Sequence, residues 1–334
     1  MLELLLRLLP VSTASLTGYY LNPDLLGYPP SHRWTVSTGW DLRNPQRLQA
    51  NAQGFLADRD FVPDPRAIAL IGDSYVEASM LDAADRPAAQ LERLIGGEPV
   101  YALGTPGTAL LDYGQRMLWA AETLGSRRFV LLLERGDIVQ SLCGSGNVVS
   151  RCLDPVGFAP RREPHSPATG LKRWLRHSSL AQYLVGHLRV DVAAFLRSVL
   201  TRQVPGEEAS AEPKPVLSAR PTAEAMLQAR ARIDAVLQVF LADLAPVLAQ
   251  ADVLILLDGA RTPPWLEGTN ERFEREYLME RLRHHGLRVI DLQPVYQAHA
   301  VRSHRALEIG PHDRHLNSLG VSVVMQAAAQ DLAR

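Results

Sequence analysis

Lysine is almost absent from this chain, which also has few cysteines and no long apolar run. Of its 35 cationic residues, only Lys172 and Lys214 are lysines, a bias that we attribute to genome composition rather than to a binding role. With 36 acidic residues the formal net charge is −1, so charge gives no reason to expect a nucleic acid as partner. Nothing in the sequence suggests a metal, a nucleotide or a redox cofactor.

The apolar residues at the N-terminus, residues 1–10, are too few to cross a membrane. Glu3 and Arg7 interrupt them, and a helix that spans a bilayer needs about 20 apolar residues. The segment also lacks the charged start and the small-residue cleavage site of a signal peptide. Two interpretations stay open. It is either the distal end of a membrane anchor, or an amphipathic first helix that packs on the domain.

The two cysteines, Cys143 and Cys152, flank a short loop that contains glycine and serine. No histidine or further cysteine lies nearby, which argues against a four-ligand zinc site. A disulfide across a loop of this length is worth about 2.5–3 kcal/mol on the chain-entropy estimate. We expect the disulfide and, with it, an oxidising compartment. The alternative is a pair of free thiols in a reducing one.

Apolar runs alternate with helix-compatible stretches along most of the chain. This alternation predicts an α/β fold, a three-layer sandwich in which helices cover both faces of a central, mainly parallel sheet. With 334 residues, 46% of them hydrophobic, the chain can bury a large core. The expected strands are residues 67–71, 100–103, 129–133, 253–257 and 289–292, and the expected helices are 76–94, 109–124, 222–250, 270–286 and 318–333.

Two segments fall outside this alternation. Residues 11–55 show little periodicity, and we assign residues 1–50 to an N-terminal extension, with the main domain at 51–334. Residues 138–221 interrupt the alternation and are expected to form an insertion in that domain. The extension carries three aromatic residues that could line a groove for a sugar or simply cover the core, namely Tyr28, Trp34 and Trp40.

Two short motifs supply a serine and the groups that would activate it. The first expected strand is followed by Gly72-Asp73-Ser74, which presents a serine at the start of a helix. Asp313 and His315 stand just before the last expected helix, close enough for the carboxylate to orient the imidazole. Serine becomes a good nucleophile when a base, held in one tautomer by a third group, takes its proton. Ser74, His315 and Asp313 are therefore the candidate catalytic triad, with His312 as the competing base.

These motifs and their order resemble the SGNH hydrolases, also called GDSL esterases and lipases. That family carries its nucleophile in an N-terminal Gly-Asp-Ser block and its Asp and His in one C-terminal block. Asn51-Ala-Gln-Gly-Phe55 resembles a segment found shortly before the Gly-Asp-Ser of bacterial members. The resemblance covers roughly residues 51–334 and implies a flavodoxin-like sheet and a hydrolase acting on ester bonds. The serine is not in a Gly-x-Ser-x-Gly elbow, which disfavours the α/β-hydrolase fold.

The family stabilises its oxyanion with three donors, and this chain matches two of them. The resemblance assigns these to the backbone of Ser74 and to Gly104 after the second strand, with Gly107 as a competitor. The third donor is an asparagine after the third strand, but residues 134–137 read Glu-Arg-Gly-Asp. Arg135 or the backbone of Gly136 could replace it. Alternatively, Arg135 only pairs with Glu134 or Asp137 on the surface. One lost donor typically costs about 100- to 1000-fold in kcat, so we expect a slow enzyme.

The resemblance implies a serine esterase that removes O-acyl groups, in particular acetyl groups, from a carbohydrate. Extracytoplasmic members with an Asp-x-His-x-Asn block include proteins that add or remove acetyl groups on polysaccharides. Two alternatives stay open, an O-acetyltransferase acting on an exported polysaccharide and a non-catalytic carbohydrate-binding relative. Many of these relatives carry a Glu-Leu-x-x-Arg-Leu segment after a membrane anchor. We therefore expect a periplasmic or otherwise extracytoplasmic protein, with membrane attachment at its N-terminus as the first of the two interpretations of residues 1–10.

Overall fold

A computed structural model describes residues 1–13, 20–22, 25–145, 150–163, 170, 175–188, 190, 222–263, 265, 270–310 and 313–334. The chain forms two compact units. The smaller contains residues 1–18, 33–48 and 166–219, and the larger contains residues 19–32, 49–165 and 220–334. The expected boundary at residue 51 and the expected insertion at 138–221 stay predictions. Within the described ranges, no helix has both the length and the apolar character that a bilayer span requires.

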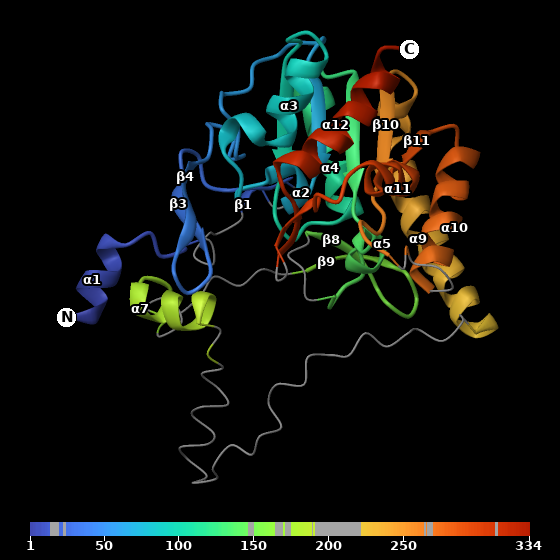
Figure 1. Cartoon of the computed structure of the whole chain (residues 1–334). Coiled ribbons are helices and arrows are strands. Elements are labelled where there is room, and N and C mark those ends of the chain that lie inside the picture. Colours follow the sequence, from blue (N-terminus) through green and yellow to red (C-terminus); the bar gives the residue numbers. More distant parts are fainter. Residues whose placement is uncertain are drawn as a thin grey trace. The chain divides into compact units, whose positions relative to one another are not determined.

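The larger unit is built on a five-stranded parallel sheet (Figure 1). Its strands are β5 (Ile68–Gly72), β6 (Val100–Gly104), β7 (Arg128–Leu133), β10 (Asp252–Leu257) and β11 (Arg288–Asp291). They lie side by side in the order β11-β10-β7-β5-β6. Counted along the chain this is the order 2-1-3-4-5 of flavodoxin-like sheets. The expected parallel, flavodoxin-like α/β fold is confirmed.

Helices cover both faces of this sheet, which gives the expected three layers. Successive residues of a strand point to opposite faces, so Ala69 and Ile71 lie in one core and Ile68 and Leu70 in the other. Since both faces are buried, the strands are continuous apolar runs. The first core is shared with α4 (Leu110–Thr123), α9 (Ala223–Leu248) and α10 (Asn270–His284), the second with α3 (Pro87–Leu94), α11 (Leu292–Arg302) and α12 (Ser318–Leu332).

The structure divides the helix expected at residues 76–94. The first part is α2 (Ser74–Glu77), and a single 3-10 turn at Ala83–Asp85 separates it from α3. Ala78 has a φ of 45° and ends α2 in the left-handed region. Pro87 fits the first turn of α3, where its missing N–H has no helical partner to lose. The expectation of one long helix here was wrong.

The sequence pattern does not predict α11. It also misses several short elements of the larger unit, because these lie in segments too short for a periodicity to develop. They are β1 (Tyr20–Asn22) with β2 (Leu25–Leu26), α5 (Asp137–Gln140), the antiparallel pair β8 (Arg151–Leu153) and β9 (Pro160–Arg162), and the antiparallel pair β12 (Glu308–Gly310) and β13 (Asp313–Leu316).

The described part of the smaller unit contains α1 (Leu2–Leu8), the paired strands β3 (Arg33–Thr38) and β4 (Arg43–Gln49), α7 (Ser179–Gln182) and a π-helical turn at Tyr183–His187. Trp34 is buried there and Trp40 is exposed. In the larger unit Tyr28 is also buried. Burial of Tyr28 and Trp34 supports a role for these two rings in covering the core rather than in lining a groove.

Candidate active site

Ser74 lies at the carboxyl end of β5, where it begins α2. The preceding Gly72 has no room for a side chain, because a Cβ there would lie 2.6 Å from Cγ2 of Val76. Asp73 caps the turn, and its carboxylate accepts the backbone N–H of Tyr75 at 2.8 Å. Ser74 is left half-buried at the edge of the sheet where parallel α/β folds place their active sites.

The structure brings the three residues of the candidate triad together. Nε2 of His315 lies 2.8 Å from Oγ of Ser74, although 241 positions separate them in the sequence. Nδ1 of His315 lies 2.6 Å from Oδ1 of Asp313, and the same oxygen accepts the backbone N–H of His315 at 3.0 Å. An ionised carboxylate can only accept, so Nδ1 carries the ring proton and Nε2 is left to accept the proton of the serine hydroxyl. His312 lies outside the described residues.

Burial and charge act in opposite directions on this pair. Burial disfavours the charged imidazolium, but the hydrogen bond and the charge of Asp313 outweigh it, so the pKa of His315 lies above its ordinary value. For Asp313 burial acts to raise the pKa, but its hydrogen bonds to His315 lower that pKa below its ordinary value. The site therefore favours an imidazolium beside a carboxylate, the state that forms when His315 takes a proton from Ser74.

A buried arginine holds the peptide group between the two triad residues of β13. Arg261 follows β10, and its side chain is only 1% exposed. Its Nη1 donates to the carbonyl oxygen of Arg314 at 3.0 Å, and its Nη2 donates to Asp258 at 2.8 Å. The hydroxyl of Tyr75 donates to the same Arg314 carbonyl at 3.1 Å, and the Tyr75 ring packs against the ring of His315.

A second buried arginine supports the strand ends beneath Ser74. Arg116, from α4, is completely buried. Its Nη1 donates to the carbonyl oxygens of Gly72 at 2.7 Å and Leu103 at 3.3 Å, which joins the ends of β5 and β6. Its Nη2 donates to the hydroxyl of Thr108 at 2.7 Å. The sequence pattern did not single out Arg116 or Arg261. The one available signal for Arg116 is a charge on the apolar face of a helix.

Buried carboxyl groups surround these strand ends. Burial is the main cause that raises the pKa of Asp73 to about 6 and the pKa of Glu77 to about 7. Burial also raises the pKa of Asp137 well above its ordinary value, with repulsion from Asp73 and Glu134 adding to it. Tyr28 donates its hydroxyl hydrogen to Glu77. These groups hold protons at pH values where exposed carboxyl groups would be ionised.

Gly104 has a clear role in packing. A Cβ at this position would lie 2.4 Å from the backbone nitrogen of Glu77, so only glycine lets α2 approach β6 this closely. Thr105 donates its N–H to the carbonyl oxygen of Gly72 on β5, at 3.3 Å. Successive N–H groups of a strand point to opposite edges, so the N–H of Gly104 is directed away from β5, the strand that leads to Ser74. Gly107 lies in the following turn, half-buried, with a φ of 72°.

Residues 134–137, which stand where the third oxyanion donor was expected, are held by hydrogen bonds and ion pairs of their own. The backbone N–H of Gly136 donates to the carboxylate of Glu134. Arg135 pairs with Glu271, with Nη1 and Oε2 3.0 Å apart. Asp137 accepts the backbone N–H of Glu134 at 2.8 Å and the hydroxyl of Tyr113 at 3.0 Å, which fixes the turn after β7. Both groups expected to replace the missing asparagine thus have carboxylate partners.

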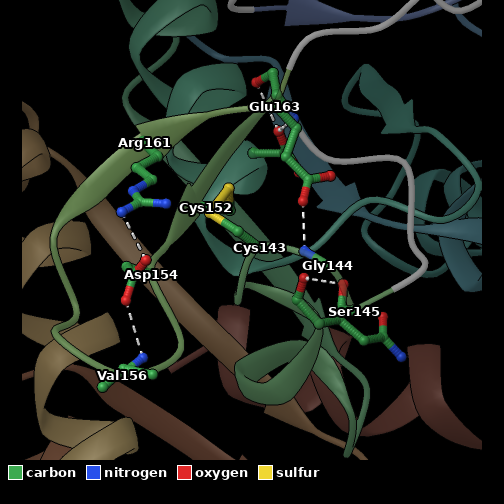
Figure 2. The surroundings of a disulfide bond; sticks show 11 residues. Cys143, Gly144, Ser145, Cys152, Asp154, Val156, Arg161 and Glu163 are labelled. Carbon is green, nitrogen blue, oxygen red and sulfur yellow. Dashed lines mark hydrogen bonds and ion pairs between the residues drawn. A yellow bond between two sulfur atoms is a disulfide. The ribbon is translucent and has the colours of Figure 1, made fainter.

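A disulfide joins Cys143 and Cys152, as expected from the sequence. It ties the segment after α5 to β8, and Glu163 accepts the N–H of Gly144 next to it (Figure 2). Across the described ranges, the one group of three His, Cys, Asp or Glu side chains within ligand reach of one another consists of these two cysteines and Glu163. Because the sulfurs bond to each other, the group does not offer thiolates to a metal ion.

Comparison with known proteins gives structural likeness only. No family model matches the chain, and no curated protein matches it. A member of the lipolytic protein G-D-S-L family from Veillonella parvula DSM 2008 is 12% identical, with a TM-score of 0.42 over 80% of this chain and 97% of that one. An alpha/beta hydrolase from the metagenome of Lake Arreo, Spain, is 13% identical, with a TM-score of 0.43 over 82% and 98%. The lipase/acylhydrolase from Enterococcus faecalis is 12% identical, with a TM-score of 0.39 over 80% and 95%.

Proposed function

We propose that the protein is a serine esterase with Ser74 as the nucleophile, His315 as the general base and Asp313 as the group that orients it. One observation carries the proposal: His315 contacts the Ser74 hydroxyl through Nε2 and the Asp313 carboxylate through Nδ1. A serine, an imidazole and a carboxylate joined in this order catalyse acyl transfer on several unrelated folds.

The reaction proceeds in two halves. Oγ of Ser74 attacks the ester carbonyl carbon while Nε2 of His315 takes its proton, and the carbonyl oxygen becomes an oxyanion. When the intermediate collapses, His315 returns the proton to the leaving alcohol oxygen, and the acyl group remains on Ser74. Water then attacks the acyl-serine with His315 as base, which releases the acid and restores the hydroxyl of Ser74.

The oxyanion needs backbone N–H groups aimed at the site. We propose the N–H of Ser74 and, on the side of β6, the N–H of Gly107 rather than that of Gly104. The direction of the Gly104 N–H, away from β5, is the reason for this choice. For a third donor the chain offers Arg135 and Gly136, which both have carboxylate partners. We therefore keep the expectation of a slow enzyme.

For the substrate we propose an O-acyl ester, in particular an acetyl ester of a carbohydrate. This choice rests on the resemblance of the sequence blocks alone. The disulfide supports a location in an oxidising compartment such as the periplasm, since thiols of reducing compartments stay free.

The test is the hydrolysis of p-nitrophenyl acetate by the full chain and by Ser74→Ala, with intact-mass analysis after treatment with a serine-reactive phosphonate. The proposal expects turnover above background, and one phosphonyl adduct, only when Ser74 is present. Equal rates for the two proteins, with no adduct, would overturn it in favour of a non-catalytic relative that binds carbohydrate. An acetylated polysaccharide as a second substrate then tests the acetyl and carbohydrate part by release of acetate.

A further inference from the structure

The first helix presents its apolar side to solvent. Five of the six leucines at residues 2–9 are at least half exposed, among them Leu4 at 67% and Leu8 at 83%. Only Leu6 is buried. A helix on the surface of a soluble domain normally does the reverse, with its apolar face buried and its charges outward. The exposed side of α1 therefore lacks an apolar partner within the described part of the chain.

The polar side of α1 is the one held by protein. Glu3 accepts the hydroxyl of Ser178 at 2.9 Å and the backbone N–H groups of Ser179 at 3.1 Å and Leu180 at 2.9 Å. These bonds fasten α1 to the first turn of α7, which lies beside it in the same unit (Figure 1). The hydrogen bond from Leu180 is the largest of the causes that lower the pKa of Glu3 to about 2. Glu3 stays ionised at neutral pH, so the orientation of α1 is fixed with the leucines outward.

The exposed apolar side chains of the described residues gather in this unit. Eleven of the 17 such large side chains belong to it. Besides Met1 and the five leucines of residues 2–9 they are Trp40, Leu175, Val185, Leu188 and Val190. Isolated exposed apolar residues need no explanation. A group of them on α1 and on the residues that flank α7, the helix in contact with α1, indicates a surface that is covered in the working protein.

The charge of the smaller unit indicates what covers this exposed apolar surface. The described residues of the smaller unit contain five arginines against Glu3 and Asp41, a net charge of +3 with histidine neutral, whereas the whole chain carries −1. Two of the arginines belong to the helical segments themselves. Arg7 in α1 pairs with Glu3, with Nε and Oε1 2.8 Å apart, and Arg176 lies just before α7. Leucines flanked by arginine are the composition of surfaces that lie in the interface of an anionic bilayer.

We propose that α1 and the π-helical turn that follows α7 form a docking surface, defined by the exposed leucines of residues 2–9 with Val185 and Leu188, that binds an anionic lipid bilayer at its surface. The leucines enter the boundary between headgroups and acyl chains, and the arginines contact lipid phosphates. Such binding is reversible and needs no membrane-spanning helix. It would hold the protein at a membrane whether or not Ser74 is an active nucleophile.

The experiment measures co-flotation of the full chain with vesicles of phosphatidylcholine alone and with about 30% phosphatidylglycerol added. The test variant is Leu4→Gln with Leu8→Gln, since glutamine keeps helix propensity while removing the apolar groups. The control is Leu227→Gln, which changes a leucine on α9 in the larger unit that is 68% exposed. We expect the wild type and the control to bind the anionic vesicles, and the double variant to partition about tenfold or more weakly.

Salt and oligomeric state complete the test. Raising the ionic strength should weaken binding, because the arginine contribution is screened. Three outcomes overturn the proposal: a wild type that stays with the soluble fraction in both vesicle types, a control that loses binding as much as the double variant, or a lipid-free dimer seen by light scattering that the double variant abolishes. The last would identify a second copy of the chain as the partner of this surface. Esterase activity is not a readout in any arm, so failure here leaves the esterase proposal standing.

Discussion

Arg261 holds the main chain of Arg314 by its carbonyl oxygen, at 3.0 Å, and thereby fixes the peptide between the aspartate and the histidine of the triad. The side chain of Arg314 itself is exposed. The guanidinium of Arg261 also lies over the Tyr75 ring, 5.0 Å from its centroid, and that ring packs against His315. Arg261 therefore acts on the imidazole from two sides, through the backbone of β13 and through an aromatic neighbour.

This arrangement predicts that Arg261→Lys lowers kcat with little change in KM. Lysine keeps the charge next to Asp258 but cannot donate in the forked geometry that joins Asp258 to the Arg314 carbonyl. We expect kcat to fall about tenfold, which corresponds to the loss of one hydrogen bond that positions His315. Arg314→Ala is the matched control and should leave kcat unchanged, because only the backbone of Arg314 is used. A rise in KM with kcat unchanged, or an equal fall of kcat in both variants, would contradict a positioning role.

The pair of His315 and Asp313 predicts the pH dependence. His315 must be neutral to accept the proton of Ser74, and its pKa lies above the ordinary value because of Asp313. Activity should therefore be low in acid and rise with pH, with an apparent pKa in kcat/KM above the ordinary value of about 6.5. In Asp313→Asn that apparent pKa should fall, and kcat should drop by up to about 10⁴-fold, as in the serine protease triad. An apparent pKa that is the same in both proteins would exclude His315 and Asp313 as the titrating pair.

The sheet and the contacts among Ser74, His315 and Asp313 could be predicted because both leave short-range marks in the sequence. Strands buried on two faces are continuous apolar runs, and the Gly-Asp-Ser and Asp-x-His motifs each lie within a few residues. Other features of the fold and the site depend on residues that are far apart in the sequence. Ala78 takes its left-handed conformation at the end of α2, a helix that packs against Gly104 of β6. Arg261 contacts Tyr75, which lies 186 positions away in the sequence. The orientation of the Gly104 N–H follows from the strand register, which no local pattern reveals.

Glu77 predicts a second pH effect, on stability. Its pKa is raised from 4.5 to about 7 by burial. Below pH 4.5 the carboxyl group is protonated in both the folded and the unfolded chain and contributes no difference. As pH rises to about 7 the unfolded chain ionises first, so this group lowers the free energy of unfolding, by roughly 3 kcal/mol once pH exceeds the folded pKa.

The comparison with Glu77→Gln isolates this contribution. Glutamine keeps an acceptor for the Tyr28 hydroxyl but does not ionise. Urea unfolding at a series of pH values from 4.5 to 8 should show the variant gaining stability relative to the wild type as pH rises. Parallel stability curves for the two proteins would mean that Glu77 ionises without cost and that its burial is not maintained in solution.

The Cys143–Cys152 disulfide predicts a dependence of stability on reductant. The cross-link lowers the conformational entropy of the unfolded chain. Reducing the disulfide should therefore lower the free energy of unfolding by about 2.5–3 kcal/mol. A variant with both cysteines changed to serine should have the lower stability already and should not respond to reductant. Thiol titration of the unfolded, unreduced wild type should find no free thiol. Two free thiols in protein isolated from an oxidising compartment would remove the support for the proposed location, while the contacts of Ser74, His315 and Asp313, which do not involve either cysteine, would still support an esterase.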